Sequence, residues 1–180
     1  MYFAPVIEDW AKGKTEQKMT EQKVKNPRKK AFEITDYESV FNLKTVGPYG
    51  AMTKIKPGAT LLFLSGLCSR DNSTGEIVGG SGESGEGDFK TQTVNIMERI
   101  KTALASMGAT MEDIYYLHVW LDENVSLEDK KNIVDPAFGQ YFKGRVPPCN
   151  VVMGIKRMYM HKSGANIEIE AWAAVMEEPS

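Results

Sequence analysis

The segment Ile167–Ala173 near the C-terminus alternates strictly between two kinds of side chain. Ile167, Ile169 and the alanines after them are apolar, whereas the positions between them carry two glutamates and a tryptophan. Successive side chains of a β-strand point to opposite faces, so this pattern predicts a strand with one apolar face. We expect helices to cover that face and Glu168 and Glu170 to lie on the other.

The remaining segments predict strands and helices in mixed order. The best helix spans residues 89–107, where apolar side chains recur at spacings of three and four and Gly108 provides a C-terminal stop. A second helical region is expected over 126–142, interrupted at Pro136. The expected extended segments are residues 32–41, 46–52, 59–65, 114–121, 151–158 and 167–175.

Several of these strands carry apolar side chains on both faces, of which Ala59–Ser65 is the clearest. Two helices can cover only one face of a sheet. Leaving the other face in water would cost roughly 25 cal/mol for each Å² of apolar surface. The simplest cover is another copy of the same chain, so the pattern indicates an oligomer.

Composition excludes several classes of protein. The 180 residues are 42% hydrophobic and 26% charged, as in ordinary globular domains, and the net charge of −2 provides no general attraction to nucleic acid or to anionic membranes. No apolar run is long enough to span a bilayer, and the N-terminus is not a signal peptide. Two cysteines without ligand spacing suggest neither a disulfide framework nor a metal site. We expect a cytoplasmic protein that uses no metal or cofactor.

The domain organisation is expected to be simple. Residues 1–32 are predicted to form an N-terminal arm, rich in lysine and with a thin apolar face, residues 33–176 the domain, and residues 177–180 a tail. The arm lacks aromatic residues among its basic ones, so a surface arm is favoured over a nucleic-acid tail.

Two kinds of side chain could carry chemistry. Glu168 and Glu170 would work in a half-dry crevice if a second copy covers their face, and such carboxylates have raised pKa values or charged partners. The alternative is an edge strand with ordinary solvated glutamates. Cys149 is either a nucleophile, if a nearby group lowers its pKa, or a small buried residue; the second interpretation is favoured.

A series of short motifs, in order and at characteristic spacing, resembles the Rid family (reactive intermediate deaminases, YjgF-type, also called L-PSP). The motifs are Gly47-Pro48-Tyr49, Leu64-Ser65-Gly66, Thr74-Gly75, Gln92, Gly108, Asp113-Ile114, Tyr141-Phe142, Val146-Pro147-Pro148 and Ile167-Glu168-Ile169-Glu170-Ala171. The resemblance implies an α/β (α+β) fold of the chorismate-mutase-like kind, with a mixed sheet and two helices on one face. It also implies a homotrimeric barrel with pockets between subunits.

The resemblance further implies the hydrolysis of reactive enamines or imines, such as 2-aminoacrylate, to a keto acid and ammonia. In that family the residues matching Tyr49, Ser65 and Gly66 shape the pocket, and the residue matching Glu168 positions the water. An asparagine of the family falls on Asp135. No cofactor is implied, and the partners are a small-molecule substrate and two further copies of the chain.

One position departs from the family pattern. The family arginine that grips the substrate carboxylate is replaced here by Cys149, and a thiol supplies neither its charge nor its two-pronged geometry. Asn150 follows it and, with Glu170, is a further candidate for substrate contact.

The turn from Ser65 to Arg70 is similar to one in the 2-aminomuconate deaminases of the same family. Arg70 is therefore either a replacement anchor for the carboxylate or a surface arginine.

The sequence thus predicts a hydrolytic deaminase for a small enamine, imine or related acid, with aromatic catabolism as a possible source of the substrate. The alternative is a non-catalytic trimer of the same family that binds a metabolite or a partner. A ribonuclease activity receives little support from the net charge of −2.

Overall fold

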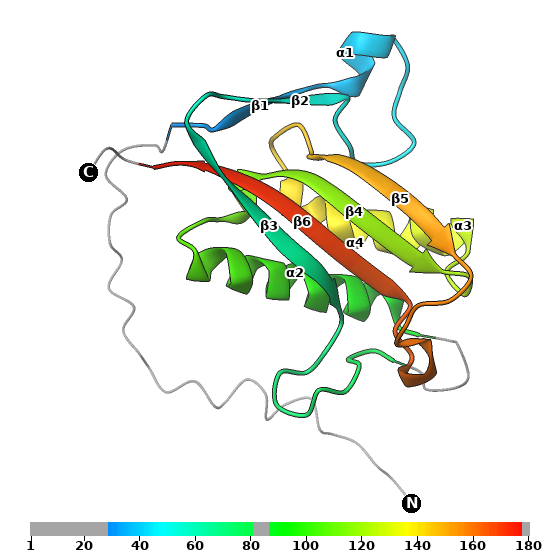
Figure 1. The fold of residues 1–180 in the computed structure, drawn as a ribbon. Coiled ribbons are helices and arrows are strands. Elements are labelled where there is room, and N and C mark those ends of the chain that lie inside the picture. The colour runs from blue at the N-terminus through cyan, green and yellow to red at the C-terminus, as the bar shows by residue number, and fades with distance from the viewer. Residues whose placement is uncertain (1–28, 81–86, 178–180) are drawn as a thin grey trace, which may run out of the picture.

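The computed structural model describes residues 29–80 and 87–177 (Figure 1). Most of the predicted arm and most of the tail lie outside these residues. The main sheet has the order β3-β6-β4-β5, built from β3 (Ala59–Cys68), β6 (Ile167–Met176), β4 (Ile114–Asp122) and β5 (Cys149–Ile155). β6 is antiparallel to both of its neighbours, whereas β4 and β5 are parallel. The sheet is therefore mixed, as predicted.

The long helix α2 (Phe89–Ser106) lies where the periodicity predicted it. The side chain of Asp88 accepts a hydrogen bond from the backbone N–H of Thr91 and caps the N-terminus. Gly108 ends the helix with a φ of 68°, a left-handed conformation that favours glycine. The buried side of α2 packs on β3 and β6.

The second helical region contains a wide turn that the sequence did not predict. A short helix, α3 (Leu127–Asp129), leads into a π-helical turn (Lys130–Val134), and α4 (Asp135–Gly139) follows. The backbone N–H of Asp135 donates to the carbonyl of Lys130, five residues earlier. Pro136, which has no N–H to donate, comes directly after this turn. The predicted interruption is thus a widened helical turn rather than a break in the helix. The whole helical region connects β4 to β5 and allows the two strands to run parallel.

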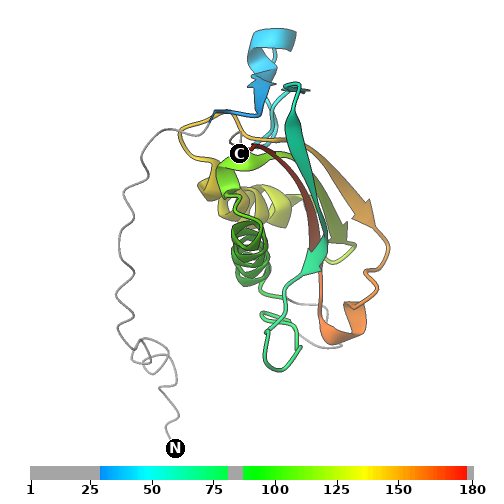
Figure 2. The ribbon, with the colours of Figure 1, turned by 60° about the vertical axis from the view of Figure 1, so that its left-hand side comes forward.

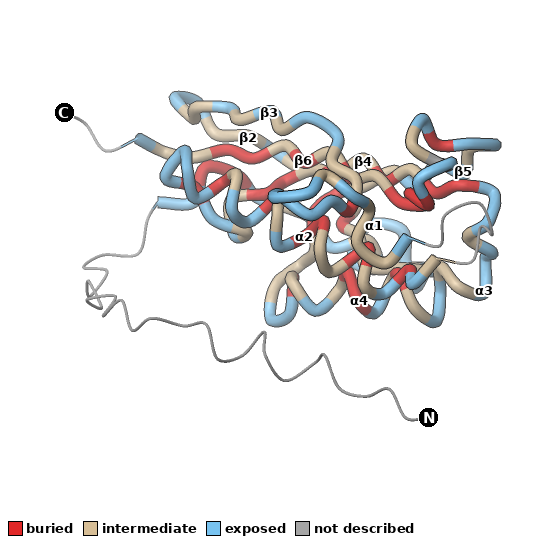
Figure 3. The backbone as a smooth tube through the Cα atoms, turned by 90° about the horizontal axis from the view of Figure 1, so that it is seen from below, coloured by how far each residue is buried: buried red, intermediate tan, exposed pale blue. Residues whose placement is uncertain are grey.

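Both helices lie on one side of the main sheet (Figure 2), which confirms the predicted layer arrangement. The core between the layers contains Ile167, Ile169 and the following alanines of β6 together with Ile96, Met97 and Ile100 of α2. Buried segments concentrate where β4 and β6 pass over the helices (Figure 3). The predicted alternation in β6 is confirmed.

Within residues 29–80 and 87–177, no helix covers the opposite face of the main sheet. Leu61 and Phe63 of β3, expected to be buried on both sides, are 42% and 65% exposed. The described part of the chain therefore leaves this outer face open, which is the condition under which a second copy would be needed.

The first predicted strand is correct only at its start. β1 (Phe32–Thr35) pairs antiparallel with β2 (Met52–Ile55), but α1 (Tyr37–Phe41) follows it. Asp36 caps α1 through the N–H of Ser39, and this local hydrogen bond competes with an extended backbone. Ala31 and Phe32, at the end of the predicted arm, are buried against Tyr115. Of the predicted strand over residues 46–52, residues 46–51 instead form a loop with bends, and only Met52 is extended, as the first residue of β2.

No helix in the described ranges is both long and apolar enough to cross a bilayer.

Candidate functional site

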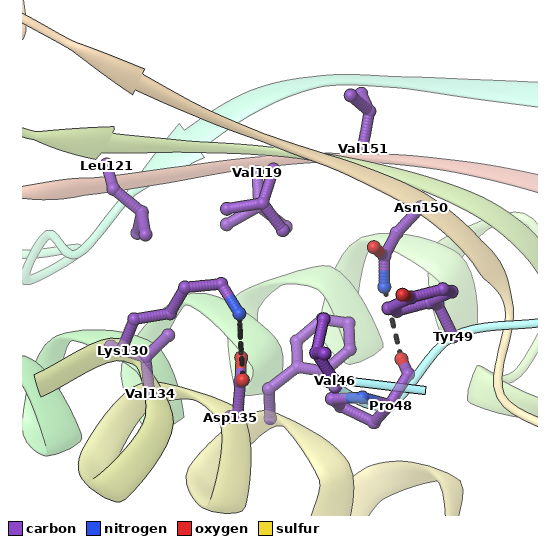
Figure 4. Close-up of a pocket in the computed structure, with 13 residues that line it drawn as sticks. Val46, Pro48, Tyr49, Val119, Leu121, Lys130, Val134, Asp135, Asn150 and Val151 are labelled. Atoms are coloured by element: carbon purple, nitrogen blue, oxygen red, sulfur yellow. Dashed lines mark hydrogen bonds and ion pairs between the residues drawn. The ribbon is translucent and has the colours of Figure 1, made fainter. Parts of the chain in front are cut away.

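A pocket of about 280 Å³ lies between the β4–β5 edge of the sheet and the second helical region (Figure 4). Its walls are mainly apolar side chains, and a few polar groups come from different elements. The loop before β2 contributes Gly47 and Tyr49, β5 contributes Asn150, and the helical region contributes Lys130 and Asp135. Enclosure by apolar walls with a few convergent polar groups is typical of small-molecule sites.

Lys130 and Asp135 form an ion pair on the helical wall of the pocket. The ammonium Nζ lies 2.8 Å from Oδ2 and 3.0 Å from Oδ1 of Asp135. The two side chains are only 19% and 17% exposed. In an α-helix, residues five apart point about 140° away from each other, because each residue turns about 100°. The wide π-helical turn brings them onto one side of the helix.

The loop that carries Tyr49 is fixed by close contact with the sheet. Asn150 Nδ2 donates to the carbonyl of Pro48 at 3.1 Å. The backbone of Gly50 lies so close to Ile34 and to the carbonyl oxygen of Pro147 that a Cβ would not fit there. The Tyr49 ring is held edge-on by Tyr37 at 5.2 Å. Tyr49 is thus a positioned wall of the pocket.

Glu168 lies on the outer face of the sheet, beside an irregularity in β3. The pairing of β3 with β6 shifts between Leu64 and Leu67, and Ser65 and Gly66 lie exposed within this bulge. A Cβ built at Gly66 would overlap the Glu168 carboxylate. Gly66 and Glu168 are therefore neighbours across the β3–β6 pair, and Ser65 lies next to Gly66 in the bulge.

The two glutamates of β6 have different surroundings. Burial, and secondarily the charge of Glu170, raises the pKa of the Glu168 carboxyl above its ordinary value. Among the described residues, the Glu168 carboxylate has no hydrogen-bond donor. Glu170 instead accepts from Trp172 Nε1 at 2.7 Å, and its other oxygen lies 3.2 Å from Nδ1 of His118. Glu168 is thus the carboxylate available to a ligand, and Glu170 orders its neighbours.

An array of aromatic rings occupies the same outer face. Trp172 lies 5.3–5.5 Å, between ring centroids, from Phe63, Tyr116 and His118, and His118 lies 5.4 Å from Trp120. We call Phe63, Tyr116, His118, Trp120 and Trp172 the outer aromatic patch. It surrounds the two glutamates with apolar area that the described residues leave partly in water.

Cys149 lies apart from Glu168 in the single chain. The strand register places Cys149 beside Tyr116, which is beside Trp172, whereas Glu168 is beside Trp120. The two residues are thus about 13 Å apart along the strands and about 10 Å apart across them. The Cys149 sulfur accepts a hydrogen bond from Thr53 Oγ1 at 3.2 Å and is buried.

Arg70 is turned toward its own loop. Its Nε donates to the carbonyl of Gly75 at 2.8 Å, and the residue is exposed. Arg70 is therefore not among the residues that line the pocket, and its guanidinium is hydrogen-bonded within its own loop.

The described residues contain no cluster of three His, Cys, Asp or Glu side chains arranged to hold a metal ion.

The predicted site residues therefore form two groups. Tyr49, Asp135 and Asn150 line the pocket on the helix side, and Ser65, Gly66, Glu168 and Glu170 gather on the outer face. Lys130 is not among the residues that the sequence indicated, because a spacing of five places two side chains on different sides of an α-helix. The sequence does contain a lysine five residues before Asp135 and six residues before Pro136. This spacing predicts a contact with Asp135 only if the helix contains a wide turn between them.

Comparison with known proteins identifies relatives of the same kind. The family model described as Endoribonuclease L-PSP matches residues 41–175. A RutC family protein of Pyrococcus abyssi is 31% identical over 130 residues, which cover 72% of this chain and 88% of the relative. A RutC family protein of Sulfurisphaera tokodaii is 30% identical and covers 67% of this chain and 87% of the relative.

Solved structures show the same fold. The Rid-family protein YyfB from Yersinia pestis aligns with a TM-score of 0.66 at 21% identity, covering 81% of this chain and 99% of that protein. A putative endoribonuclease from Thermotoga maritima aligns with a TM-score of 0.52 at 26% identity, covering 75% and 91%. The α+β fold predicted from the motif series is therefore confirmed.

Proposed function

This chain belongs to the Endoribonuclease L-PSP family, the Rid family of the sequence analysis, and from that premise we propose that it is a hydrolytic deaminase of small enamines or imines. The observation that carries the proposal is the Glu168 carboxylate. It is half-buried, has a raised pKa, receives no hydrogen bond from the described residues and lies against the exposed Ser65–Gly66 bulge.

A carboxylate in this state is suited to holding and deprotonating water. In the proposed reaction, the water oxygen bonds to the carbon of the C=N group while Glu168 accepts a proton. Glu168 returns that proton to the nitrogen, which gives a carbinolamine. Glu168 then takes the proton of the new hydroxyl group and delivers it to the nitrogen, so that the C–O bond becomes a carbonyl, the C–N bond breaks and ammonia leaves. Ser65 and the backbone of the bulge are placed to orient the substrate.

The assembly proposed with this function is a homotrimer. The outer aromatic patch gives each chain a large apolar surface around Glu168, and a second copy placed there would remove the carboxylate from bulk water. In such an assembly the pocket at the β5 edge of one subunit would adjoin the Glu168 face of the next. This arrangement would unite the two groups of site residues.

The names of the relatives also raise the possibility of ribonuclease activity. The lining of the pocket does not favour it, because Lys130 is neutralised by Asp135 and an RNA backbone needs unpaired positive charge. We therefore retain the hydrolysis of small molecules as the proposal, with 2-aminomuconate-like substrates of aromatic catabolism as the first to be tested.

The test is ammonia release from 2-aminoacrylate and 2-aminomuconate, each generated in the assay by a coupled enzyme. We expect the wild-type protein to accelerate release beyond the uncatalysed rate. Glu168→Gln should reduce kcat/KM by about 10²-fold or more, as removal of an acid–base group does. Glu76→Gln, a change at an exposed glutamate of the 71–78 loop, is the matched control and should leave the rate unchanged.

No acceleration with either substrate, or full activity in Glu168→Gln, would overturn the proposed role. The non-catalytic alternative would then be supported by binding of a small acid without turnover.

A further inference from the structure

The Lys130–Asp135 ion pair has unused hydrogen-bonding capacity inside the pocket. An ammonium group has three N–H donors, and at most two of them are directed at the Asp135 oxygens. The described residues provide no third acceptor for Nζ. Asp135 likewise keeps lone pairs that no described donor other than Lys130 uses. The pair can therefore donate one hydrogen bond to a ligand and accept one from it.

The pair lies next to the backbone of Gly47, which lines the same pocket. A Cβ built at Gly47 would lie 3.3 Å from Oδ2 of Asp135 and 3.7 Å from Nζ of Lys130. Because position 47 has no side chain, nothing from this residue crowds the donor and the acceptor on that side. A ligand group in the pocket can therefore approach both of them.

The charges of the pair restrict which ligand group can bind beside it. A carboxylate would be attracted by Lys130 but repelled by Asp135. A cation would be attracted by Asp135 but repelled by Lys130. With both side chains more than four-fifths buried, water screens these repulsions weakly. A group with a donor and an acceptor side by side satisfies both residues without repulsion.

We infer that this pocket selects small molecules without net charge that present an N–H donor beside an oxygen acceptor, as a primary amide or an amino-acid zwitterion does. The apolar walls, including Val119, Val134 and Phe138, bind the remainder of the molecule. The inference deepens the proposed function, on which it rests by treating the pocket as part of the substrate site. Of the two test substrates it favours 2-aminoacrylate, whose iminium tautomer is neutral overall, over 2-aminomuconate, which carries two carboxylates.

The inference also explains how the chain functions with Cys149 in place of a carboxylate-binding arginine. A ligand whose own charges are balanced needs no unpaired cation. The positive charge of Lys130 is balanced by the negative charge of Asp135 in the ion pair, so the pocket lining has no net charge.

Three probes of nearly identical shape separate the possibilities: benzamide, benzoate and benzamidine. Benzamide presents an oxygen acceptor beside an N–H donor, benzoate presents two acceptors, and benzamidinium presents only donors. Binding would be followed in the full-length protein by NMR titration of the valine methyl groups, with Val119 and Val134 as reporters within the pocket.

We expect wild-type protein to bind benzamide at least about tenfold more tightly than benzoate or benzamidinium, a difference of about 1.4 kcal/mol. Asp135→Asn should reverse the order in favour of benzoate, because Lys130 is then unopposed. Lys130→Met should favour benzamidinium.

Each single variant leaves one partly buried charge without its partner and could unfold the protein. The double variant Lys130→Met/Asp135→Asn avoids this, and it should bind the three probes with preferences differing by less than about threefold. Tighter binding of benzoate than of benzamide by the wild-type protein, or no shift of the pocket methyl groups with any probe, would overturn the inference. An unchanged benzamide preference in the double variant would overturn it as well.

Failure of the two proposals can be told apart. A benzamide preference without any deamination would overturn the proposed function alone. Deamination by a protein that prefers benzoate would overturn the pocket inference alone.

Discussion

Gly66 leaves open the space that the Glu168 carboxylate occupies, because a Cβ at position 66 would overlap Oε1 of Glu168. The two residues belong to strands that meet at the β3 bulge, one residue out of regular pairing. The backbone of one strand therefore sets the position of the side chain on the next. This contact permits a test of the carboxylate's position without removing the carboxylate.

Gly66→Ala should displace the Glu168 carboxylate while leaving the fold intact, because the overlapped atoms are the far end of a flexible side chain. We expect kcat to fall about tenfold or more, since catalytic geometry tolerates little displacement. The thermal midpoint should shift by only a few degrees. Gly154→Ala is the control, because a Cβ at Gly154 meets nothing within 4 Å. A fully active Gly66→Ala protein would show that the position of the carboxylate is not critical.

The raised pKa of Glu168 should appear in the pH dependence of activity. A general base must be deprotonated, so the acidic limb of the kcat/KM profile should lie above the ordinary glutamate pKa of 4.5. Glu170→Gln removes the second cause of the shift, and the limb should then move to lower pH. The pH–rate profiles of the two proteins provide the measurement. A limb at or below pH 4.5 in the wild type would contradict the assignment.

The same shift predicts a pH-dependent contribution to stability. Because the folded-state pKa lies above the unfolded one, the stability associated with protonated Glu168 is complete below pH 4.5 and is lost as pH rises through the folded pKa. Relative to wild type, Glu168→Gln should therefore become progressively more stable between acidic and neutral pH. Urea unfolding of both proteins at pH 4 and pH 7.5 checks this. A stability difference independent of pH would exclude an elevated pKa.

The outer aromatic patch should hold the oligomer together. Phe63 is 65% exposed in the single chain, and Phe63→Glu would place a charge inside the proposed interface. We expect this variant to sediment as a monomer, whereas the wild type sediments as a trimer. Tyr159→Glu, at a side chain 97% exposed and outside the patch, is the control. A monomeric wild-type protein would remove the basis for a covered Glu168.

Cys149→Ser should keep most of the activity. The thiol is buried, receives a hydrogen bond from Thr53 and lies far from Glu168 within the chain. A serine hydroxyl can accept the same hydrogen bond, so we expect kcat within about threefold of wild type and normal folding by circular dichroism. Loss of activity with retained fold would instead identify Cys149 as a nucleophile.

The sequence by itself determined the layers of this protein. The alternation of Ile167–Ala173 assigned an inner and an outer face to the last strand, and the three- and four-residue spacing located α2. Both signals are local, because the side-chain periods of a strand and of a helix follow directly from backbone geometry. The motif series that resembles the Rid family then indicated the fold and grouped Ser65, Gly66 and Glu168.

Only the tertiary structure decided how the remaining candidates are distributed. It placed Asp135 and Asn150 in a pocket on the helix side of the sheet and separated Cys149 from Glu168. It also brought Lys130 to Asp135 through a π-helical turn. These relationships depend on the pairing register of strands distant in sequence and on a helical turn of unusual width. Neither leaves a periodic signal along the chain, because the register depends on contacts between distant segments and the π-helical turn departs from the α-helical period.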